Sequence, residues 1–356
     1  MPRTGAHRPG PPLTGAAPQD RVTRFYATAI PGLEPVVADE ITERLPGVTA
    51  VRVHQGRRQG RVSFVYERSP RHLQTLGSVR GVYAQLAEID GVTVGQPGLA
   101  RVTSMLAGLS FGAVGRLLRG LQPDIDPSTF QLSATVQGPH RFQAAELAQA
   151  AETALCEGAG LRRRPVSTAM HLALQVDGRR AHLGVRLPAA DDGDPLAYCV
   201  ARLAGIGPGD RVLLLRTPPV WADVVMPACG AEWCLNLVDT LPHLPASATV
   251  LMDGEHWPVG DEVAGSVIGF AGDPRLAEIR QWTRALVPGG TVVVVVADAS
   301  RFATMLRQHE VPLEVMAAVA VNLNGRQRTI FVLGSEAPDD PAAVTGPPLL
   351  QIDPAS

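Results

Sequence analysis

The chain is poor in cysteine, in aromatic residues and in long apolar runs. Its four cysteines, Cys156, Cys199, Cys229 and Cys234, contain no Cys-x-x-Cys pair. We therefore expect neither a disulfide framework nor a metal site, and a reducing cytoplasm is the expected compartment. No apolar run approaches the length of about eighteen residues that a membrane helix needs, so no membrane association is expected. Aromatic residues make up only 4% of the chain, which leaves Ala, Val and Leu to build the cores.

Lysine is missing altogether, and all 32 basic residues are arginines. Residues 1–190 hold 22 arginines against 14 acidic residues, whereas residues 191–356 hold 10 arginines against 20 acidic residues. A GC-rich coding sequence accounts for the missing lysine but not for this asymmetry. Because the arginine fork suits phosphate, the first half is the predicted place for nucleic-acid contact. The acidic second half is a candidate surface for a protein partner.

The first half of the chain contains the patterns of two small α+β domains. A disordered tail is expected over residues 1–21, where apolar side chains are few. Strand, helix, hairpin, helix and strand patterns follow in an order typical of a ferredoxin-like domain, which we place at residues 22–92. Residues 93–190 are expected to contain two helical stretches, a long strand, a helix closed by glycines and a hairpin that turns at Asp177-Gly178.

The second half alternates short apolar strands with helical stretches, as a parallel sheet requires. A Pro/Asp-rich linker is expected at residues 191–196, an α/β domain at 197–336 and a loose tail at 337–356. The run "TVVVVVAD" is typical of a strand buried on both faces, and "VPGG" before it predicts a turn. The segments "LEVMAAVAV" and "TIFVLG" predict a final hairpin, so the sheet ends with an antiparallel strand. The expected fold class is α/β combined with α+β in several domains.

A seven-stranded sheet with an antiparallel last strand resembles the class I S-adenosylmethionine-dependent methyltransferase fold. The upstream segments "ATAIPGLEPVVADEI", "FQLSATVQGPHRFQAAELAQAAETAL" and "LALQVDGRRAHLGVRL" resemble the THUMP-containing tRNA guanine-N2 methyltransferases. In that family a ferredoxin-like domain and a THUMP domain precede the methyltransferase domain. The resemblance covers Arg24 to Ser335. It implies that residues 93–190 form a THUMP domain that docks the acceptor end of tRNA, and that the last domain methylates a guanine amine.

Candidate RNA-binding residues flank one predicted helix of the THUMP-like region. His140, Arg141 and Phe142 stand just before it, where free backbone N–H groups also favour phosphate. The run Arg162, Arg163 and Arg164 stands just after it, suited to phosphates or to stacking on unpaired bases. A second arginine cluster on a hairpin, Arg57, Arg58 and Arg61, is explained equally well as a solvated turn.

The cofactor turn departs from the family pattern. The family ends its first strand in Asp and follows it with a turn of the type F-x-G-x-G, whose glycines let the backbone approach the ligand. Laid on that pattern, "RVLLLRTPPVWADVV" places Leu214 at the acid, Pro218 at the first glycine and Val220 at the second. Proline lacks the N–H and valine disfavours positive φ, so these changes oppose binding. The resemblance implies that Asp239 stands where an acid would bind the ribose hydroxyls of the cofactor, and Asp253 where one would contact its adenine amino group.

The segment at the place of the catalytic motif also differs from the family pattern. The family uses N-P-P-Y after the fourth strand, and here "SVIGFAGDPRL" places Gly269 and Phe270 at the first two positions. A shift of a few residues offers Asp273 and Pro274 as substitutes, and Asp261 is a further acceptor nearby in the sequence.

Three hypotheses follow. The leading one is an RNA-binding protein whose methyltransferase-like domain has lost S-adenosylmethionine-dependent activity, so that no cofactor is expected. The second is an active tRNA methyltransferase with a remodelled S-adenosylmethionine site. The third is a non-catalytic scaffold whose acidic domain docks a partner protein. Enzymatic activity stays open, because the loss of both motifs removes the groups for donor and acceptor alike.

Overall fold

The computed structural model describes residues 22–189, 193–218, 220–229, 231–238, 249–251, 257–270, 272 and 274–335. The tails expected at 1–21 and 337–356 lie outside these residues. The chain forms two compact units that divide it within strand β4: unit 1 contains Ala84–Arg186, and unit 2 combines Arg24–Tyr83 with the chain from Leu187 onwards. Each unit is described by itself.

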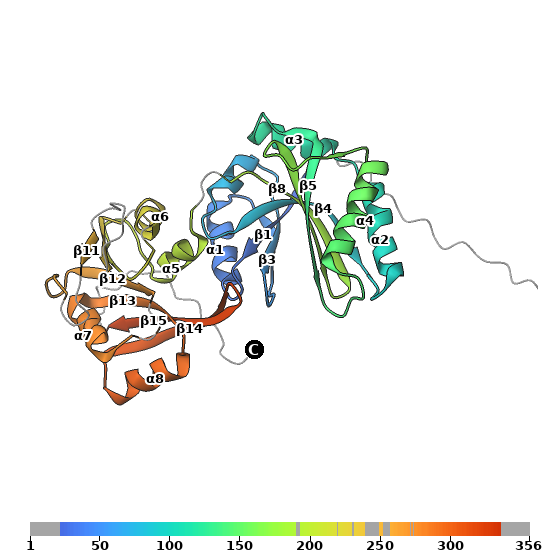
Figure 1. Ribbon diagram of the computed structural model, residues 1–356. Coiled ribbons are helices and arrows are strands. Elements are labelled where there is room, and N and C mark those ends of the chain that lie inside the picture. Colours follow the sequence, from blue (N-terminus) through green and yellow to red (C-terminus); the bar gives the residue numbers. More distant parts are fainter. Residues whose placement is uncertain are drawn as a thin grey trace, which may run out of the picture. The chain divides into compact units, whose positions relative to one another are not determined.

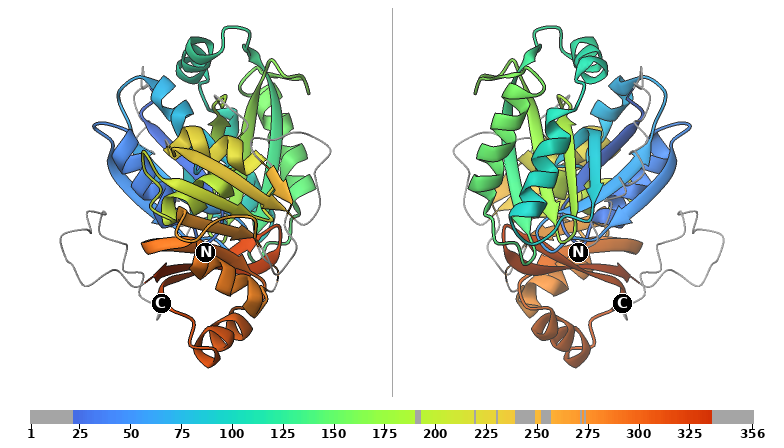
Figure 2. Two further views of the ribbon diagram at one scale, coloured as in Figure 1. Left: turned by 90° about the vertical axis from the view of Figure 1, so that its left-hand side faces the viewer. Right: turned by 90° about the vertical axis from the view of Figure 1, so that its right-hand side faces the viewer.

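Unit 1 is a mixed sheet with two helices packed side by side (Figures 1 and 2). Its strands follow the order β4-β8-β7-β5-β6, in which β5 pairs with β7 in parallel and β7 with β8 antiparallel. The hairpin predicted at Asp177-Gly178 joins β7 to β8 and is confirmed. The elements of this unit are β4 (Gly81–Asp90), α2 (Gln96–Ala107), α3 (Gly112–Leu121), β5 (Asp126–Gln137), α4 (Ala144–Glu157), β6 (Arg162–Arg163), β7 (Ala169–Asp177) and β8 (Arg180–Arg186).

Unit 2 begins with an antiparallel set of strands in the order β2-β3-β1, together with helix α1. Helix α1 presents an apolar stripe to the core, with Val36, Val37 and Ile41 buried. The polar turn expected between the two strands of the hairpin joins β2 to β3. These elements are β1 (Arg24–Ala29), α1 (Glu34–Arg44), β2 (Thr49–His54), β3 (Gly60–Val65) and a 3-10 helix (Pro70–Thr75).

The larger part of unit 2 is a seven-stranded sheet in the order β11-β10-β9-β12-β13-β15-β14. The first five strands are parallel and β15 pairs antiparallel with β13 and β14, as the final hairpin predicted. Helices α5 and α6 cover one face, and α7 and α8 cover the other (Figure 1). The elements are α5 (Pro195–Leu203), β9 (Arg211–Leu215), α6 (Val220–Cys229), β10 (Trp233–Val238), β11 (Thr249–Leu251), β12 (Ala264–Phe270), α7 (Leu276–Ala285), β13 (Leu286–Val296), α8 (Ala299–Gln308), β14 (Leu313–Leu323) and β15 (Arg326–Ser335).

The centre of this sheet is almost pure hydrocarbon. Val292, Val293 and Val294 of β13 are fully buried, as expected for a strand covered on both faces. The turn expected at "VPGG" is wrong in one respect, because these residues lie within β13. Leu286 pairs with Ala264 and the next pair is Thr291 with Ser266. The residues between therefore form a bulge in the ladder rather than a connection before it.

Candidate functional site

The candidate site of the seven-stranded sheet lies where its strand order reverses. Strands β9 and β12 are parallel neighbours, although the chain passes through β10 and β11 between them. In open α/β sheets, ligands bind beyond the carboxyl ends of the strands at such a point. The segments after Leu215 and around Phe270 are therefore the two edges of the candidate site.

Leu214, at the position where the resemblance expects an acid, belongs to the core. Its side chain is fully buried and shares a cluster with Val212, Ile268 and Trp221. Its partner across the β10 ladder is Asn236. A hydrocarbon side chain at this place offers no anchor for a charged ligand.

The residues after β9 are engaged with the protein itself. Arg216 adopts a φ of 51°, a conformation that L side chains rarely take, and its guanidinium forms an ion pair with Glu278 of α7. Thr217 is buried, with its hydroxyl 3.5 Å from Oδ1 of Asn236. The carbonyl of Pro218 accepts from the N–H of Trp221 at 2.9 Å. The polar groups of this turn are thus directed to neighbouring elements.

Trp221, in the first turn of α6, is in contact with the last residue of β12. Its side chain is 1% exposed, and its Nε1 donates to Oδ2 of Asp194 at 2.9 Å. Asp194 also caps α5, because its other oxygen accepts from the N–H groups of Leu196 and Ala197. The indole packs edge-on against Phe270, with centroids 6.1 Å apart and planes at 87°. An aromatic pair therefore joins the start of α6 to the last residue of β12.

The sequence did not single out Trp221 as a site residue, although signals were present. Asp194 directly precedes Pro195, a combination typical of a helix start. A tryptophan directly after a proline-containing turn is a large side chain with one N–H to satisfy. What the sequence does not show is that these two segments meet.

The other residues predicted for this site have different positions. Pro274 is buried between β12 and α7, whereas Asp239, Asp253 and Asp273 lie outside the described residues. Asp261 precedes β12 and pairs with Arg284 of α7 at 2.6 Å. It therefore belongs to the amino end of that strand, away from the candidate edge. The roles of the three unplaced acids remain predictions.

In unit 1, the segment before α4 contains an exposed arginine, Arg141, next to a buried aromatic residue, Phe142. Phe142 is 3% exposed and packs against the ring of His140, with centroids 4.8 Å apart. Nε2 of His140 lies 2.6 Å from the carbonyl of Gly178, while the side chain of Arg141 is exposed. Phe142 is thus placed to support this loop rather than to stack on a base. No side chain caps the first turn of α4, which leaves its N–H groups available to an anion.

The bond from His140 to Gly178 brings a further arginine to the same end of unit 1. Arg179 follows Gly178 in the β7–β8 turn, its side chain is exposed, and its carbonyl accepts from the N–H of Val92 at 2.8 Å. The sequence pattern marked this stretch only as a hairpin. Its proximity to Arg141 depends on the fold of unit 1.

The second predicted cluster lies at the other end of β5. Arg162 and Arg163 pair with Thr129 and Phe130 near the start of β5, whereas Gln137 ends that strand before the Arg141 loop. Seven residues of strand separate the two places by about 23 Å. The structure therefore separates the two predicted sets instead of joining them in one pocket.

Two of the three clustered arginines also have acidic partners. Nε of Arg163 lies 2.8 Å from Glu152 of α4, and Arg162 contacts the hydroxyl of Ser128 at 2.9 Å and Asp126 at 3.8 Å. Hydrogen bonds from Ser128, with help from Arg162 and Arg164, lower the pKa of Asp126. Part of the charge of this cluster is therefore already compensated.

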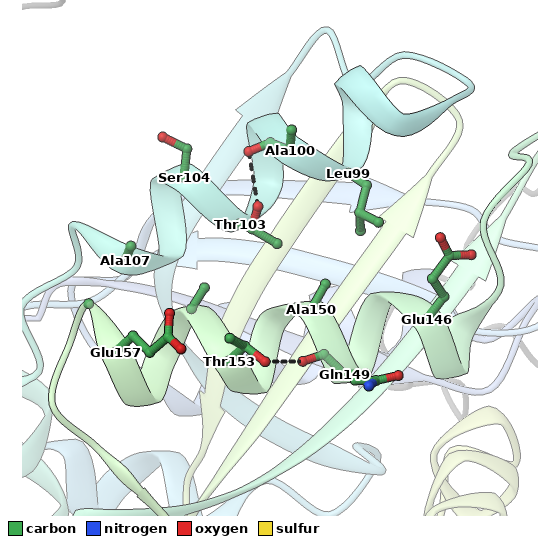
Figure 3. Close-up of a pocket in the computed structure, with 12 residues that line it drawn as sticks. Leu99, Ala100, Thr103, Ser104, Ala107, Glu146, Gln149, Ala150, Thr153 and Glu157 are labelled. Atoms are coloured by element: carbon green, nitrogen blue, oxygen red, sulfur yellow. Dashed lines mark hydrogen bonds between the residues drawn. The ribbon is translucent and has the colours of Figure 1, made fainter.

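Helices α2 and α4 border an open groove of about 790 Å³ (Figure 3). Small and hydroxylated side chains such as Ala150 and Thr153 form its floor, and Glu146 and Glu157 stand at its ends. With acids at both ends and no arginine in its lining, this groove does not suit phosphate. We therefore place any RNA contact of unit 1 at the ends of β5 rather than along these helices.

The described part of the chain also bears on metal and membrane binding. Among the described residues, no group of three His, Cys, Asp or Glu side chains stands close enough to hold a metal ion. None of the described helices has the length and apolarity needed to cross a membrane.

No protein-family model and no curated protein sequence matches the chain. Solved structures do match over nearly the full length. TrmN from Thermus thermophilus aligns with a TM-score of 0.68 and 19% identity, over 88% of this chain and 99% of that one. SMU.472, a putative methyltransferase complexed with SAH, aligns with 0.59 and 8% identity, over 89% and 98%.

A third structure, a predicted N6-adenine-specific DNA methylase from Listeria monocytogenes, aligns with a TM-score of 0.57 and 12% identity, over 89% of this chain and 96% of that one. At these identities the likeness establishes the fold. The chain has a methyltransferase-like fold, and the likeness extends through both halves of the chain.

Proposed function

We propose that this protein binds structured RNA, with tRNA as its ligand, and that its methyltransferase-like sheet does not transfer methyl groups from S-adenosylmethionine. The observation that carries the proposal is the Trp221–Phe270 pair, which occupies the junction between the start of α6 and the end of β12. The methyl donor and its acceptor would have to meet at this junction. RNA binding rests on the resemblance to THUMP-containing enzymes and on exposed arginines at the ends of β5.

The described residues at the sheet edge do not fit S-adenosylmethionine. Leu214 supplies carbon where an acid would hold the methionine part, and Pro218 has no N–H to donate. The indole of Trp221 is buried against the core and has its single donor satisfied by Asp194.

RNA contact at the α4 end of unit 1 follows from charge and geometry. Arg141 and Arg179 are exposed, and the ring of Phe142 fixes the loop between them and α4. Two guanidinium forks beside an uncapped helix N-terminus suit the oxygens of a phosphate backbone. Arg164, exposed at the opposite end of β5, is placed to touch a phosphate farther along the same strand of RNA.

Two binding measurements test the proposal. Calorimetric titration with S-adenosylmethionine and with S-adenosylhomocysteine should give no binding, with and without bulk tRNA. Fluorescence anisotropy with labelled tRNA over a salt series should give binding that weakens as salt rises. The double variant Arg141→Gln/Arg179→Gln should flatten that salt dependence by roughly 0.7–0.9 in log–log slope for each phosphate that the protein no longer neutralises.

A matched control is the double variant Arg101→Gln/Arg119→Gln, which removes the same charge from exposed positions on α2 and α3. It should leave the slope close to that of the wild type. Micromolar binding of S-adenosylmethionine would overturn the non-catalytic half of the proposal. Absence of tRNA binding would overturn the other half.

An active methyltransferase with a remodelled cofactor site is the second candidate. The observation in its favour is the neighbour that aligns over 98% of its length and is complexed with SAH. This candidate requires transfer of a labelled methyl group from S-adenosylmethionine to tRNA, and loss of that transfer in Asp273→Ala. A wild-type protein without transfer rules it out.

A further inference from the structure

Two hairpins far apart in the sequence meet within unit 2. Asn322, near the end of β14, donates from Nδ2 to the carbonyl of Arg57 in the β2–β3 loop at 3.1 Å, and from its backbone N–H to Pro31 at 3.2 Å. The neighbouring Gly32 has a φ of 95°, and a Cβ there would stand 2.0 Å from the carbonyl oxygen of Ala320. Only glycine permits so close an approach. Figure 1 shows the β14–β15 hairpin reaching the β1–β3 strands.

The register of β15 shows which way its arginines face. Ile330 and Val332 belong to a core cluster that also contains Ile30 of the N-terminal segment. Because side chains alternate along a strand, Arg328 and Arg326 share that face and lie towards the same segment. Arg326 is exposed and Arg328 is half-buried. The tips of the two hairpins, which the contact between Asn322 and Arg57 holds together, thus both carry arginines.

Within the described part of the chain, the arginines of the two hairpin tips have no acidic partner, whereas some other arginines of unit 2 do. Among the described residues, no ion pair involves Arg57, Arg58, Arg326 or Arg328. By contrast, several other arginines of the same unit are paired: Arg202 with Glu43, Arg216 with Glu278 and Arg284 with Asp261.

Glu34 is close to the β2–β3 loop, but its carboxylate is directed to the backbone rather than to the surface. Glu34 is 1% exposed, and its carboxylate accepts from the N–H of Gly32 at 2.8 Å and from the backbone of Gly56. Burial raises its pKa, since the charged form is poorly solvated there. This carboxylate therefore supports the loop from below and is not available to a guanidinium at the surface.

We propose that Arg57, Arg58, Arg326 and Arg328 form a second RNA-binding surface, on unit 2. This inference rests on the proposed function. Four guanidinium groups with no acidic partner among the described residues retain their charge for phosphate, and the other residues of the two turns, 55–59 and 324–325, are Gln, Asn and Gly. A membrane-binding surface would add apolar side chains to its arginines, and these two turns carry none. We name the four residues the hairpin arginines.

The test compares salt dependence in matched double variants of the full chain. Arg57→Gln/Arg58→Gln and Arg326→Gln/Arg328→Gln should each weaken binding of labelled tRNA by about tenfold at low salt, and each should reduce the log–log salt slope by roughly 0.7–0.9 for every phosphate left without its arginine. The control Arg280→Gln/Arg307→Gln removes the same charge from exposed positions on α7 and α8, on the other face of the sheet. It should leave the slope unchanged.

A charge-preserving variant keeps the test decisive if a glutamine pair lowers stability. Arg57→Lys/Arg58→Lys retains both charges and should keep the slope, although it loses the bidentate geometry of arginine. Thermal unfolding of every variant identifies any loss of folding.

The outcomes separate this inference from the function on which it rests. If the hairpin variants behave like the α7–α8 control while Arg141→Gln/Arg179→Gln weakens binding, the second surface is wrong and the proposed function stands. If the wild-type protein does not bind tRNA, both are wrong. A reduced slope in both hairpin variants, with an unchanged control, supports the second surface.

Discussion

Two of the buried contacts between distant segments of unit 2 are built in opposite ways. At the sheet edge, Trp221 fills the junction with carbon and makes a single side-chain hydrogen bond, to Asp194. Between α1 and α5, the fully buried carboxylate of Glu40 accepts from the N–H groups of Gly77 and Ser78, both at 2.9 Å, and from the hydroxyl of Ser78. One contact is aromatic and nearly apolar, whereas the other is a hydrogen-bonded ion.

The surroundings of Glu40 extend this polar contact to α5. Arg44 lies 3.7 Å from the carboxylate and stacks over the ring of Tyr198, 5.3 Å from its centroid. Tyr198 is also hydrogen-bonded to Glu40, and Sγ of Cys199 lies 3.8 Å from the carbonyl of Ser78. The N-terminal segment is thus tied to the seven-stranded sheet by directional bonds.

The difference shows where this chain has placed its polar groups. A cofactor site needs exposed donors and acceptors at the strand ends, yet the described strand ends have buried carbon and internally bonded polar groups. The contact that needs no ligand is the one rich in hydrogen bonds. Directional hydrogen bonds therefore fix the contact between α1 and α5, whereas the described residues at the sheet edge offer few groups that could bind a ligand.

The largest expected effect comes from removing the aromatic contact between Trp221 and Phe270. Trp221→Ala removes a buried indole and should lower the free energy of unfolding by about 3–5 kcal/mol, because it leaves a cavity. Urea denaturation followed by circular dichroism measures the loss. Trp282→Ala, an equally buried indole on α7 at the other face of the sheet, serves as the control for size and should cost a similar amount.

Calorimetry on Trp221→Ala sharpens the result. The variant should still not bind S-adenosylmethionine, because Leu214 and Pro218 remain. A destabilisation below about 1 kcal/mol would show that the indole is not part of the core, contrary to its burial.

The second-largest effect comes from disturbing the hydrogen bonds of the buried Glu40 carboxylate. Glu40→Gln keeps the shape but turns one acceptor into a donor facing backbone N–H groups, and should cost about 1–3 kcal/mol. Urea denaturation measures the loss.

Glu43→Gln is the matched control for Glu40→Gln. It removes an acid one turn along α1 whose side chain is 61% exposed and paired with Arg202. An exposed pair contributes little, so the loss should stay below about 1 kcal/mol. Equal losses in the two variants would contradict the view that the buried network joins α1 to α5.

The sequence predicted the strands of unit 2 better than the contacts between them. The apolar runs of β9 and β13 and the final hairpin were predictable because period and β-branched content mark buried strands locally. The bond between Glu40 and Ser78 joins positions 38 residues apart, and the bond between Asn322 and Arg57 spans 265. Such pairs leave no local pattern, because each partner alone has the signature of an ordinary surface residue.

The position of the candidate site was predictable from the sequence, but the side chains that pack there were not. The resemblance to the methyltransferase family placed the cofactor turn after β9, and the absence of its glycines and acid could be read directly from the sequence. That Trp221 enters the junction and finds Asp194 depends on how α5 and α6 pack. The two arginine sets of unit 1 were predicted together because they flank α4 in sequence, and the length of β5 separates them in space.

The smallest effect concerns His171, a partly buried group whose charged form is disfavoured by its surroundings. Burial and then Arg186 lower the pKa of His171 on β7 below its ordinary value of about 6.5. Between these two pKa values the unfolded chain binds a proton and the folded chain does not, so stability falls as the pH drops through this window. His171→Gln should therefore flatten the acid-side loss of stability, measured as urea midpoints at neutral and mildly acidic pH. The exposed His309→Gln should keep the wild-type slope, and an equal flattening in both variants would show that burial of His171 is not its cause.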